Sequence, residues 1–423
     1  MYKKTILNNG LRVIAHPMPK MQSLALGIWL KVGARYERAD QSGISHFLEH
    51  LLFKGTKKYS CRRIKESIEG VGGSLNGFTS EELTCYLVKI PANYLNLALN
   101  ILSDMVIDPL LSPSEIQREK TVILEEIKMY RDLPQSHVYE LLDELLWPDQ
   151  PLGAPIIGSA EIVSRISRKE LSLFKQRYYT PCNIVISAAG LLDYNKLLGG
   201  VKRIFCDRKN QDQVEFQKAR EGQNKPRLKI YNKKTEQTHM ALGFHGFSRD
   251  HHSKHAQNLL HVILGANMSS RLFNQIREKE GLAYEIGTLV KRYQDTGAFV
   301  VHAGMDNRKV LDALRLVLKE LRKIKKTLVS TDEFQRAKDF YLGQTKLALE
   351  DTLNHMLWIG ETSATLDRAY SLSDIIKEVN RVTREDLRKV AQYIFQERRL
   401  NLALITPLRM SEDKLKEQLG LIS

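Results

Sequence analysis

The sequence predicts an α+β fold of two homologous domains, on three observations. The chain has 423 residues, of which 43% are hydrophobic, enough for two cores of about 200 residues each. A strongly polar segment, residues 207–226, lies near the middle. A similar order of strands, helix, glycine turn, further strands and long amphipathic helices occurs on both sides of it. We therefore expect domains at 1–206 and 227–423, joined by a linker at 207–226.

In the first half, apolar runs at 11–15 and 24–32 are typical of strands. Residues 44–53 carry apolar side chains at helical spacing, and a glycine follows them as a helix stop. The glycine-rich turn at 70–73 leads into a further strand at 83–90. Long amphipathic helices are expected after this strand.

The second half repeats this order. Strands are expected at 228–231 and 239–244, and a helix at 256–264. Gly281 marks the turn that precedes a later strand at 299–302. The repetition indicates two related domains, and a site in one copy need not recur in the other.

The charge of the chain is basic but dispersed. It has 64 Lys and Arg against 49 Asp and Glu, a formal net charge of +15. One cluster, at residues 315–326, lies in an amphipathic helix without the interleaved aromatic residues of a nucleic-acid platform. We expect a solvated helix face and no nucleic-acid partner.

Targeting and redox features are few. No run approaches the roughly 20 apolar residues of a membrane span, and the first ten residues lack a signal or transit pattern. We therefore expect a cytoplasmic protein without membrane association. The four cysteines are far apart in sequence, which favours buried free thiols over disulfides; they are Cys61, Cys85, Cys182 and Cys206.

The sharpest local pattern is His-Phe-Leu-Glu-His at residues 46–50. On a helix, His46 and His50 are four residues apart and differ by about 40° in direction, so both imidazoles can reach one metal ion. Glu49 lies on the adjoining side. Two neutral imidazoles suit Zn²⁺, and a neighbouring carboxylate can deprotonate water. The alternative is two ordinary partly buried histidines with Glu49 in an intrahelical ion pair, so a third ligand is the deciding feature.

The helix expected at residues 112–131 offers that third ligand. Glu119 and Glu126 are seven residues apart and point within about 20° of one another. Either can ligate a metal while the other helps outside the coordination sphere. His137 is a rival ligand, but Pro134 is expected to break the helix before it.

These residues resemble a known family. His46, Glu49 and His50, with Glu126 further along the chain, look like the inverted zinc motif of the pitrilysin and insulin-degrading enzyme family. The surrounding HFLEHLLFKGTK and REKTVILEEI sequences are especially similar to the mitochondrial processing peptidase β subunit and its bacterial relatives. The resemblance implies two domains, each with a mainly antiparallel sheet packed with helices.

The resemblance also implies site roles. His46, His50 and Glu126 would bind Zn²⁺, Glu49 would act as general base, and Glu119 would be the auxiliary acidic residue of the active-site helix. These roles define a first domain that carries out the metal chemistry.

Residues 75–80 (LNGFTS) resemble the family's active-site edge strand, in which Asn76, Gly77 and Phe78 would bind substrate. An edge strand has unpaired backbone groups and can bind an extended peptide by strand addition. This chain has Gly77 where Ala is usual, so we expect a looser edge. Without the zinc motif, the segment would be interpreted as an ordinary hairpin edge.

Residues 269–284 resemble the family's C-terminal substrate-clamping segment, with Arg277 and Tyr284 as the pair that contacts the substrate carbonyl region. Arg can donate to a peptide carbonyl, and a Tyr hydroxyl can stabilise an oxyanion. Without the resemblance, Arg277 would be a surface charge and Tyr284 a core aromatic. The second domain lacks another His-x-x-Glu-His motif and is expected to be non-catalytic.

The resemblance therefore implies a zinc endopeptidase that hydrolyses unfolded or short polypeptides in a chamber formed by dimerisation. Because one chain carries both the zinc residues and the Arg and Tyr pair, a homodimer is favoured over a heterodimer with an inactive homologue. The alternative function is a non-proteolytic scaffold or assembly subunit of the same fold.

Overall fold

The computed structural model describes residues 2–209 and 215–420 and divides the chain into two compact units. Unit 1 consists of Met1–Lys128, Ala154–Gln217 and Lys346–Leu372. Unit 2 consists of Met129–Gly153, Lys218–Thr345 and Ser373–Ser423. Met129–Gly153 comes from the first half of the sequence but belongs to unit 2, and Lys346–Leu372 comes from the second half but belongs to unit 1. The single division expected at 207–226 does not include this exchange, because hydrophobic periodicity identifies a helix but not the sheet that it covers.

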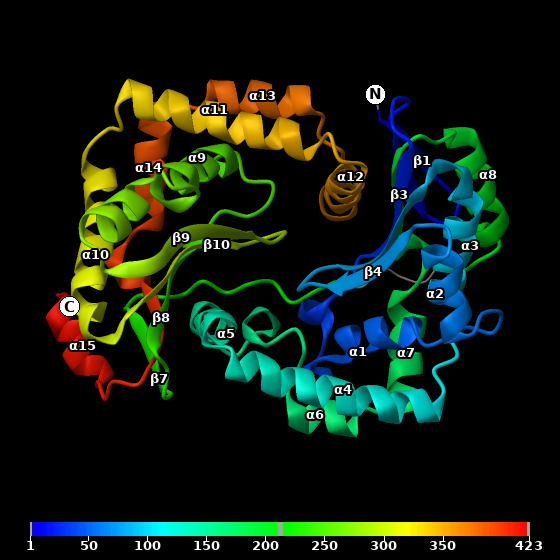
Figure 1. The fold of residues 1–423 in the computed structure, drawn as a ribbon, viewed down its shortest axis with the longest axis horizontal. Coiled ribbons are helices and arrows are strands. Elements are labelled where there is room, and N and C mark those ends of the chain that lie inside the picture. The colour runs from blue at the N-terminus through cyan, green and yellow to red at the C-terminus, as the bar shows by residue number, and fades with distance from the viewer. Residues whose placement is uncertain (1, 210–214, 421–423) are drawn as a thin grey trace. The chain divides into compact units, whose positions relative to one another are not determined.

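Unit 1 is built on a six-stranded sheet of order β1-β2-β6-β3-β5-β4. Its strands β1, β3 and β4 are labelled in Figure 1. Only β2 and β6 run parallel; the other pairs are antiparallel. The strands are β1 (Lys3–Ile6), β2 (Arg12–Pro17), β3 (Ser23–Leu30), β4 (Ser74–Thr79), β5 (Thr84–Pro91) and β6 (Ile184–Gly190). The helices are α1 (Ile44–Leu52), α2 (Cys61–Glu69), α3 (Leu95–Ile107), α4 (Pro113–Asp132), α6 (Ala160–Arg165), α7 (Arg168–Tyr178), α8 (Tyr194–Phe205) and α12 (Thr352–Leu366).

Both faces of this sheet are covered. Alternate residues of the strands pack with α12 on one face and with α1, α3, α7 and α8 on the other. The fully apolar run of β3 fits a central strand that is buried on both sides. A Cβ at Gly360 of α12 would lie 2.1 Å from Nε1 of Trp29 on β3. Glycine is therefore needed where this helix approaches the sheet closely.

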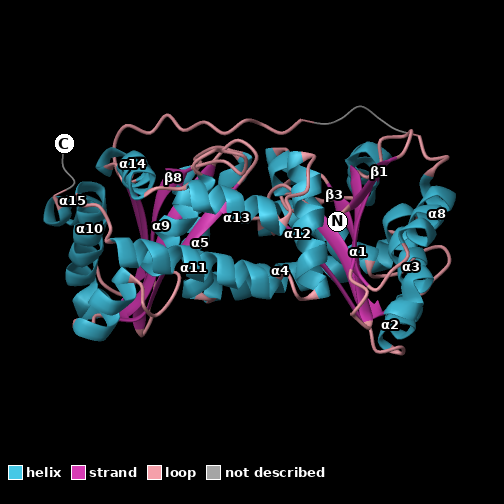
Figure 2. Cartoon of the chain, turned by 90° about the horizontal axis from the view of Figure 1, so that it is seen from above, coloured by secondary structure: helices cyan, strands magenta, loops and turns pink. Residues whose placement is uncertain are grey.

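Unit 2 is built on a five-stranded sheet of order β7-β11-β8-β10-β9, in which β7 and β11 run parallel. Helix α5 covers one face, and α9, α10 and α14 lie on the other (Figure 2). The strands are β7 (Arg227–Asn232), β8 (Gln237–Gly246), β9 (Ala283–Arg292), β10 (Gly297–Asp306) and β11 (Asn401–Thr406). The helices are α5 (Pro134–Leu146), α9 (Lys254–Gly265), α10 (Val310–Lys326), α11 (Thr331–Ala348), α13 (Leu372–Arg381), α14 (Arg384–Ile394) and α15 (Glu412–Leu419).

The two sheets repeat one topology. The order β2-β6-β3-β5-β4 in unit 1 matches β7-β11-β8-β10-β9 in unit 2, with the parallel pair at the same place. In each unit one sheet face is covered by a helix from the opposite half of the chain, namely α12 in unit 1 and α5 in unit 2. The predicted fold class, two homologous α+β domains, is confirmed.

The elements expected from the sequence are found with shifted ends. They correspond to β2, β3, α1 and β5 in the first half and to β7, β8, α9 and β10 in the second. All four cysteines are free, as expected. However, only Cys85 is buried, and Cys206 is exposed.

The polar segment 207–226 is only partly a linker. Residues 210–214 lie outside the part of the chain that the structure describes. Beyond them, the ring of Phe216 stacks at 3.9 Å on the guanidinium of Arg35, whose Nη2 also donates to the carbonyl of Gln217 at 3.1 Å. These contacts fix residues 216 and 217 to unit 1, immediately before the chain passes into unit 2 at Lys218.

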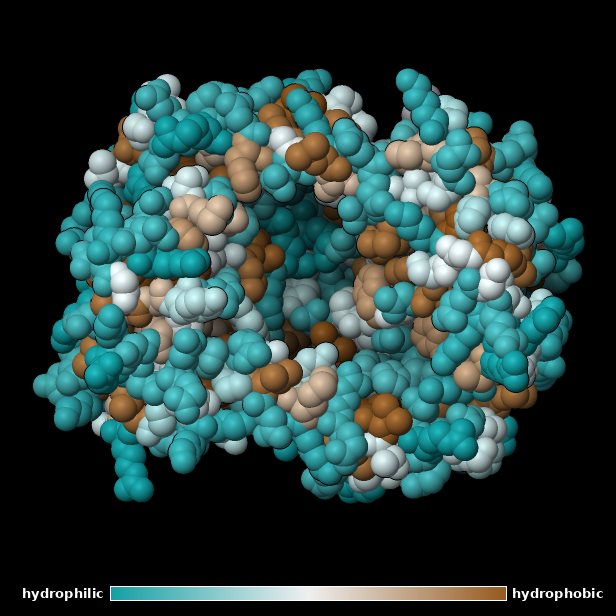
Figure 3. Space-filling view, in the orientation of Figure 1, coloured by the Kyte–Doolittle hydropathy of each residue, from teal (hydrophilic) through white to brown (hydrophobic). Residues whose placement is uncertain are grey.

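The visible faces of the two units are mainly hydrophilic, with scattered apolar residues (Figure 3). Scattered apolar residues are normal on protein surfaces. In residues 2–209 and 215–420, the helices include none with the length and apolar character that a membrane crossing requires.

Candidate metal centre

Helix α1 carries the candidate ligands on one face and core residues on the other. Its buried residues include Phe47 and Leu48, so His46, Glu49 and His50 lie on the less buried side. Before the helix, Gly43 adopts a left-handed conformation with φ of 92°. A Cβ there would lie 2.6 Å from the carbonyl oxygen of Ile157, so glycine is required.

The N-terminus of α1 is held by the buried side chain of Glu37. Its Oε2 accepts from the backbone N–H of Gly43 at 2.7 Å, and its Oε1 accepts from that of Ser45 at 2.8 Å. These donors are free at any helix start, and an anionic partner there is favoured by the helix dipole. Burial nevertheless raises the pKa of Glu37 to about 7, while the hydrogen bonds from Ser45 and Gly43 act in the opposite direction.

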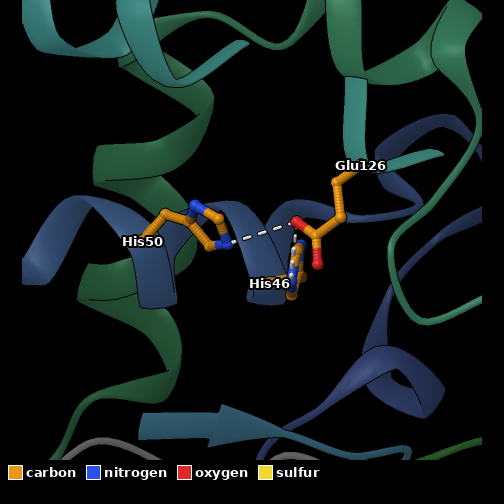
Figure 4. Close-up of side chains that lie close together, drawn as sticks. All are labelled: His46, His50 and Glu126. Carbon is orange, nitrogen blue, oxygen red and sulfur yellow. Dashed lines mark ion pairs between the residues drawn. The ribbon is translucent and has the colours of Figure 1, made fainter. Parts of the chain in front are cut away.

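His46, His50 and Glu126 converge on one point (Figure 4). Oε2 of Glu126, on α4, lies 3.9 Å from Nε2 of His46 and 3.6 Å from Nε2 of His50. The three potential ligand atoms lie within 4.8 Å of one another. Across residues 2–209 and 215–420, no other trio of His, Cys, Asp or Glu side chains is grouped in this way.

Glu119 lies beside this trio rather than in it. Its Oε2 is 3.1 Å from Nδ1 of His50, and its Oε1 pairs with Nζ of Lys54 at 2.7 Å. A proton on Nδ1 that is donated to Glu119 leaves Nε2 of His50 with its lone pair toward Glu126. The alternatives that the sequence left open are thus separated by geometry, since only Glu126 faces both imidazoles.

The electrostatics of the site favour metal binding. Burial, with a smaller effect of the neighbouring His50, lowers the pKa of His46 to about 4, so His46 is neutral near pH 7. Burial raises the pKa of Glu126 against the opposing effect of His50. Two imidazole nitrogens and one carboxylate oxygen form the donor set of a catalytic zinc site. The residues present therefore fit Zn²⁺.

Glu49 lies next to the trio but is held separately. Oγ1 of Thr79, at the end of β4, donates to Oε2 of Glu49 at 2.7 Å. Burial raises the pKa of Glu49, and the hydrogen bond from Thr79 opposes this rise. A carboxylate with a raised pKa beside a metal position is suited to accept a proton from water and release it later.

Strand β4 is the last strand of its sheet and pairs only with β5 among the described strands. A Cβ at Gly77 would lie only 3.0 Å from the ring of Phe53. The strand keeps a continuous register with β5 through this glycine, and the expectation of a looser edge stays a prediction. Phe53 fills the space that an alanine would need. Oδ1 of Asn76 accepts from the Gly77 N–H at 2.8 Å. The half-exposed Phe78 packs edge-on against Trp29 at 5.7 Å.

In unit 2 the structure brings Arg277 and Tyr284 together. Arg277 lies in a short π-helical segment, Phe273–Lys279, directly before β9. Its guanidinium carbon is 5.7 Å from the ring centre of Tyr284 and 4.6 Å from that of Phe273. Tyr284 is 74% exposed, which excludes a core role.

Histidines outside the motif have structural partners. Nε2 of His255 lies 2.8 Å from Glu378, and Nδ1 of His261 lies 2.7 Å from the hydroxyl of Thr288. His137, the rival ligand, lies in unit 2 after the helix break and contacts Glu140 at 3.0 Å. Each of these three histidines therefore has a partner outside the metal trio.

Sequence reasoning missed three residues that hold this site, Glu37, Lys54 and Thr79. Lys54 follows His50 by one helical turn, and this spacing could have indicated that it lies near the site. Thr79 belonged to a recognised segment without being given a role. Glu37 gave no local signal, because its partners are backbone groups.

Comparison with known proteins gives matches over most of the chain. A family model described as insulinase, peptidase family M16, matches residues 12–160. A second, described as the peptidase M16 inactive domain, matches residues 165–341. The division agrees with the place of the metal trio, which among the described residues is found in the first half alone.

Curated relatives align from end to end. A protein of Streptomyces coelicolor is 35% identical over 96% of this chain and 90% of its own length. One of Bacillus subtilis is 34% identical over 96% of this chain and 98% of its own length. One of Mycobacterium tuberculosis is 34% identical over 99% of this chain and 95% of its own length. All three are named as uncharacterized zinc proteases.

Two solved structures share the fold. A protease from Helicobacter pylori superposes with a TM-score of 0.91 at 23% identity, over 96% of this chain and 99% of its own. A Pseudomonas fluorescens structure, described as a peptidase M16 inactive domain, superposes with a TM-score of 0.89 at 17% identity. The match covers 97% of this chain and 99% of that chain. At these identities the likeness concerns the fold alone.

Proposed function

Because the chain belongs to the insulinase family of peptidases, family M16, we propose that it is a zinc endopeptidase that hydrolyses unfolded or short polypeptides. The observation that carries this proposal is the convergence of His46, His50 and Glu126 beside the separately held Glu49. A scaffold protein of the same fold would have no need for four such groups in one place.

His46, His50 and Glu126 would hold the metal through Nε2, Nε2 and a carboxylate oxygen. When bound, Zn²⁺ supplies Lewis acidity, which polarises a peptide carbonyl and acidifies water. Glu119 holds the ring of His50 in the orientation that presents Nε2. These four residues would bind and orient the metal, and the proton of the attacking water goes to another residue.

Glu49 acts as the proton carrier. Its carboxylate accepts the proton of the attacking water and then passes it to the nitrogen of the leaving amine. Burial raises the pKa of Glu49, which makes its carboxylate a stronger base toward the attacking water.

Five residues are proposed to bind substrate. An extended peptide would add to the edge of β4 along Asn76, Gly77 and Phe78. Arg277 and Tyr284 would donate to a substrate carbonyl, and the Tyr284 hydroxyl would stabilise the oxyanion. The exposure of Tyr284 supports this role, because its hydroxyl is available to a ligand.

We further propose that the reaction takes place in a chamber completed by a second subunit. A homodimer is favoured because this chain carries both the metal trio and the Arg277 and Tyr284 pair. A heterodimer with an inactive homologue is the other arrangement. Size measurement of the purified chain, alone and in a pull-down from its own cells, distinguishes them.

The test of the function is Glu49→Gln. The zinc-loaded wild type should cleave internally quenched peptides. The variant should keep near-stoichiometric zinc, but its cleavage rate should be about 10²- to 10⁴-fold lower. Glu125→Gln is a matched control, because Glu125 is exposed and pairs with Lys128. A Glu49→Gln variant with full activity would contradict the mechanism, and a wild type without zinc or cleavage would favour the scaffold.

A further inference from the structure

The last residue of the edge strand contacts the carboxylate of Glu49. Thr79 Oγ1 donates to Glu49 Oε2 at 2.7 Å. We propose that Thr79 is a positioning residue that holds the Glu49 carboxylate in its working orientation, so that one strand both binds the substrate and orients the base. This inference rests on the proposed peptidase function and adds a residue to it.

Thr79 is itself held by a tight hairpin. It pairs with Thr84 in the ladder between β4 and β5. The turn that follows is closed by the Ser80 N–H, which donates to the Leu83 carbonyl at 2.8 Å. The Ser80 hydroxyl donates to the same carbonyl at 3.0 Å. The backbone at Thr79 therefore has little freedom to move away from Glu49.

A neighbouring segment fixes this hairpin to the rest of unit 1. The N–H of Ala34 donates to the Ser80 carbonyl at 3.1 Å, and the N–H of Arg35 donates to the Glu81 carbonyl at 2.7 Å. The side chain of Arg35 also donates to Oε1 of Glu82 at 2.7 Å, with both side chains almost fully buried. A buried, charge-assisted hydrogen bond of this kind sets a defined geometry.

The segment that carries Arg35 also fixes the helix that carries Glu49. Two residues after Arg35, Glu37 binds the N-terminus of α1, the helix that carries Glu49. Residues 33–37 thus fix both the strand end with Thr79 and the helix with Glu49. The hydrogen bond between Thr79 and Glu49 is therefore supported by the backbone on both sides, since the strand end and the helix are each fixed to residues 33–37.

The hydrogen bond has a clear chemical consequence. A carboxylate has two oxygens, and a donor on one of them fixes the plane of the group and leaves the other oxygen for water. Misplacement of a reacting group by about 1 Å can reduce a rate by about 100-fold. Loss of the Thr79 hydroxyl should therefore reduce kcat, while strand addition, which uses the backbone, should leave KM near its wild-type value.

The test compares Thr79→Val with Thr79→Ser in the full-length, zinc-loaded chain, with internally quenched peptides as the probe. Val keeps the shape and removes the donor, and Ser keeps the donor. We expect Thr79→Val to lower kcat by about 10- to 100-fold with unchanged zinc content. Thr79→Ser should stay within about threefold of the wild type, because its hydroxyl can still donate.

Thr84→Val is the matched control. Thr84 is the ladder partner of Thr79, but its hydroxyl donates to the Val32 carbonyl and not to Glu49. This variant should lower the melting temperature without lowering kcat. In a Glu49→Gln background, Thr79→Val should cause no further loss, since the group it orients is no longer a base.

Several results would overturn the proposal. They are a wild-type kcat in Thr79→Val, an equal loss in Thr79→Ser, and a full additional loss in the Glu49→Gln background. A crystal structure of Thr79→Val in which Glu49 has not moved would do the same, even if the peptides are not cleaved. A wild type that cleaves nothing would refute the peptidase function, whereas an active wild type with an unaffected Thr79→Val refutes the Thr79 role alone.

Discussion

Replacing Glu37 by Gln tests how the metal-binding helix is anchored. Burial raises the pKa of Glu37 in the folded protein from 4.5 to about 7. Between these values the folded state holds a proton that the unfolded state releases, so the free energy of unfolding falls as the pH rises. A difference from 4.5 to about 7 corresponds to about 3 kcal/mol at pH 7.5 and above.

The Gln variant has no such dependence. Its side chain resembles protonated Glu37, since each has one carbonyl oxygen that can accept from the N–H groups of Gly43 and Ser45. Glu37→Gln should therefore be close to the wild type in stability at pH 5, where Glu37 is protonated in the folded protein. Toward pH 8 the wild type should lose about 2.5 kcal/mol relative to the variant.

Urea unfolding of the metal-free chains from pH 5 to pH 8 measures this difference. Metal binding would add its own pH dependence, so a chelator is present throughout. In a Trp147→Phe background, the remaining tryptophans, Trp29 and Trp358, both belong to unit 1 and report its unfolding. A difference that stays constant with pH would refute the raised pKa. A wild type that gains relative stability as the pH rises would show that the N–H donors outweigh burial.

Three further variants test other contacts. Glu119→Gln should weaken zinc binding by about 10- to 100-fold in a chelator competition, because Nδ1 of His50 loses its anionic partner. An unchanged zinc affinity would show that Glu119 does not support the metal site. Tyr284→Phe should lower kcat by about 10²- to 10³-fold if its hydroxyl stabilises the oxyanion, with zinc content as the control; an unaffected kcat would exclude that role. Arg35→Met should destabilise unit 1 by about 3–5 kcal/mol in urea unfolding, because it removes one member of the buried ion pair with Glu82. A loss below about 1 kcal/mol would show that this pair adds little to the stability of unit 1.

The sequence was sufficient for features that depend on local geometry. His46 and His50 lie on one helix face because of their spacing, and the break at Pro134 follows from its missing N–H. The repeated order of elements predicted two related sheets, since each element carries its own periodicity. Such features need no knowledge of distant segments.

Features that depend on packing were not accessible in this way. Glu119 and Glu126 share a helix face, and only the packing of α4 against α1 determines which of them faces both imidazoles. Glu37 and Thr79 act on partners that lie on other elements. The ring of Phe53 occupies the space beside Gly77, a contact between distant residues that no local pattern indicates.

The exchange of α5 and α12 affects how this protein can be divided. A cut between Gln217 and Lys218 separates the two copies of the ancestral repeat but gives neither fragment a complete sheet cover. The N-terminal fragment would expose the apolar face that Met356 and Ile359 of α12 now cover. The sequence repeat and the compact structural unit therefore have different boundaries. A chain truncated to the metal-binding half lacks α12, which forms part of the core of unit 1. Complementation by two co-expressed fragments, each supplying the other's missing helix, is the natural way to study the halves separately.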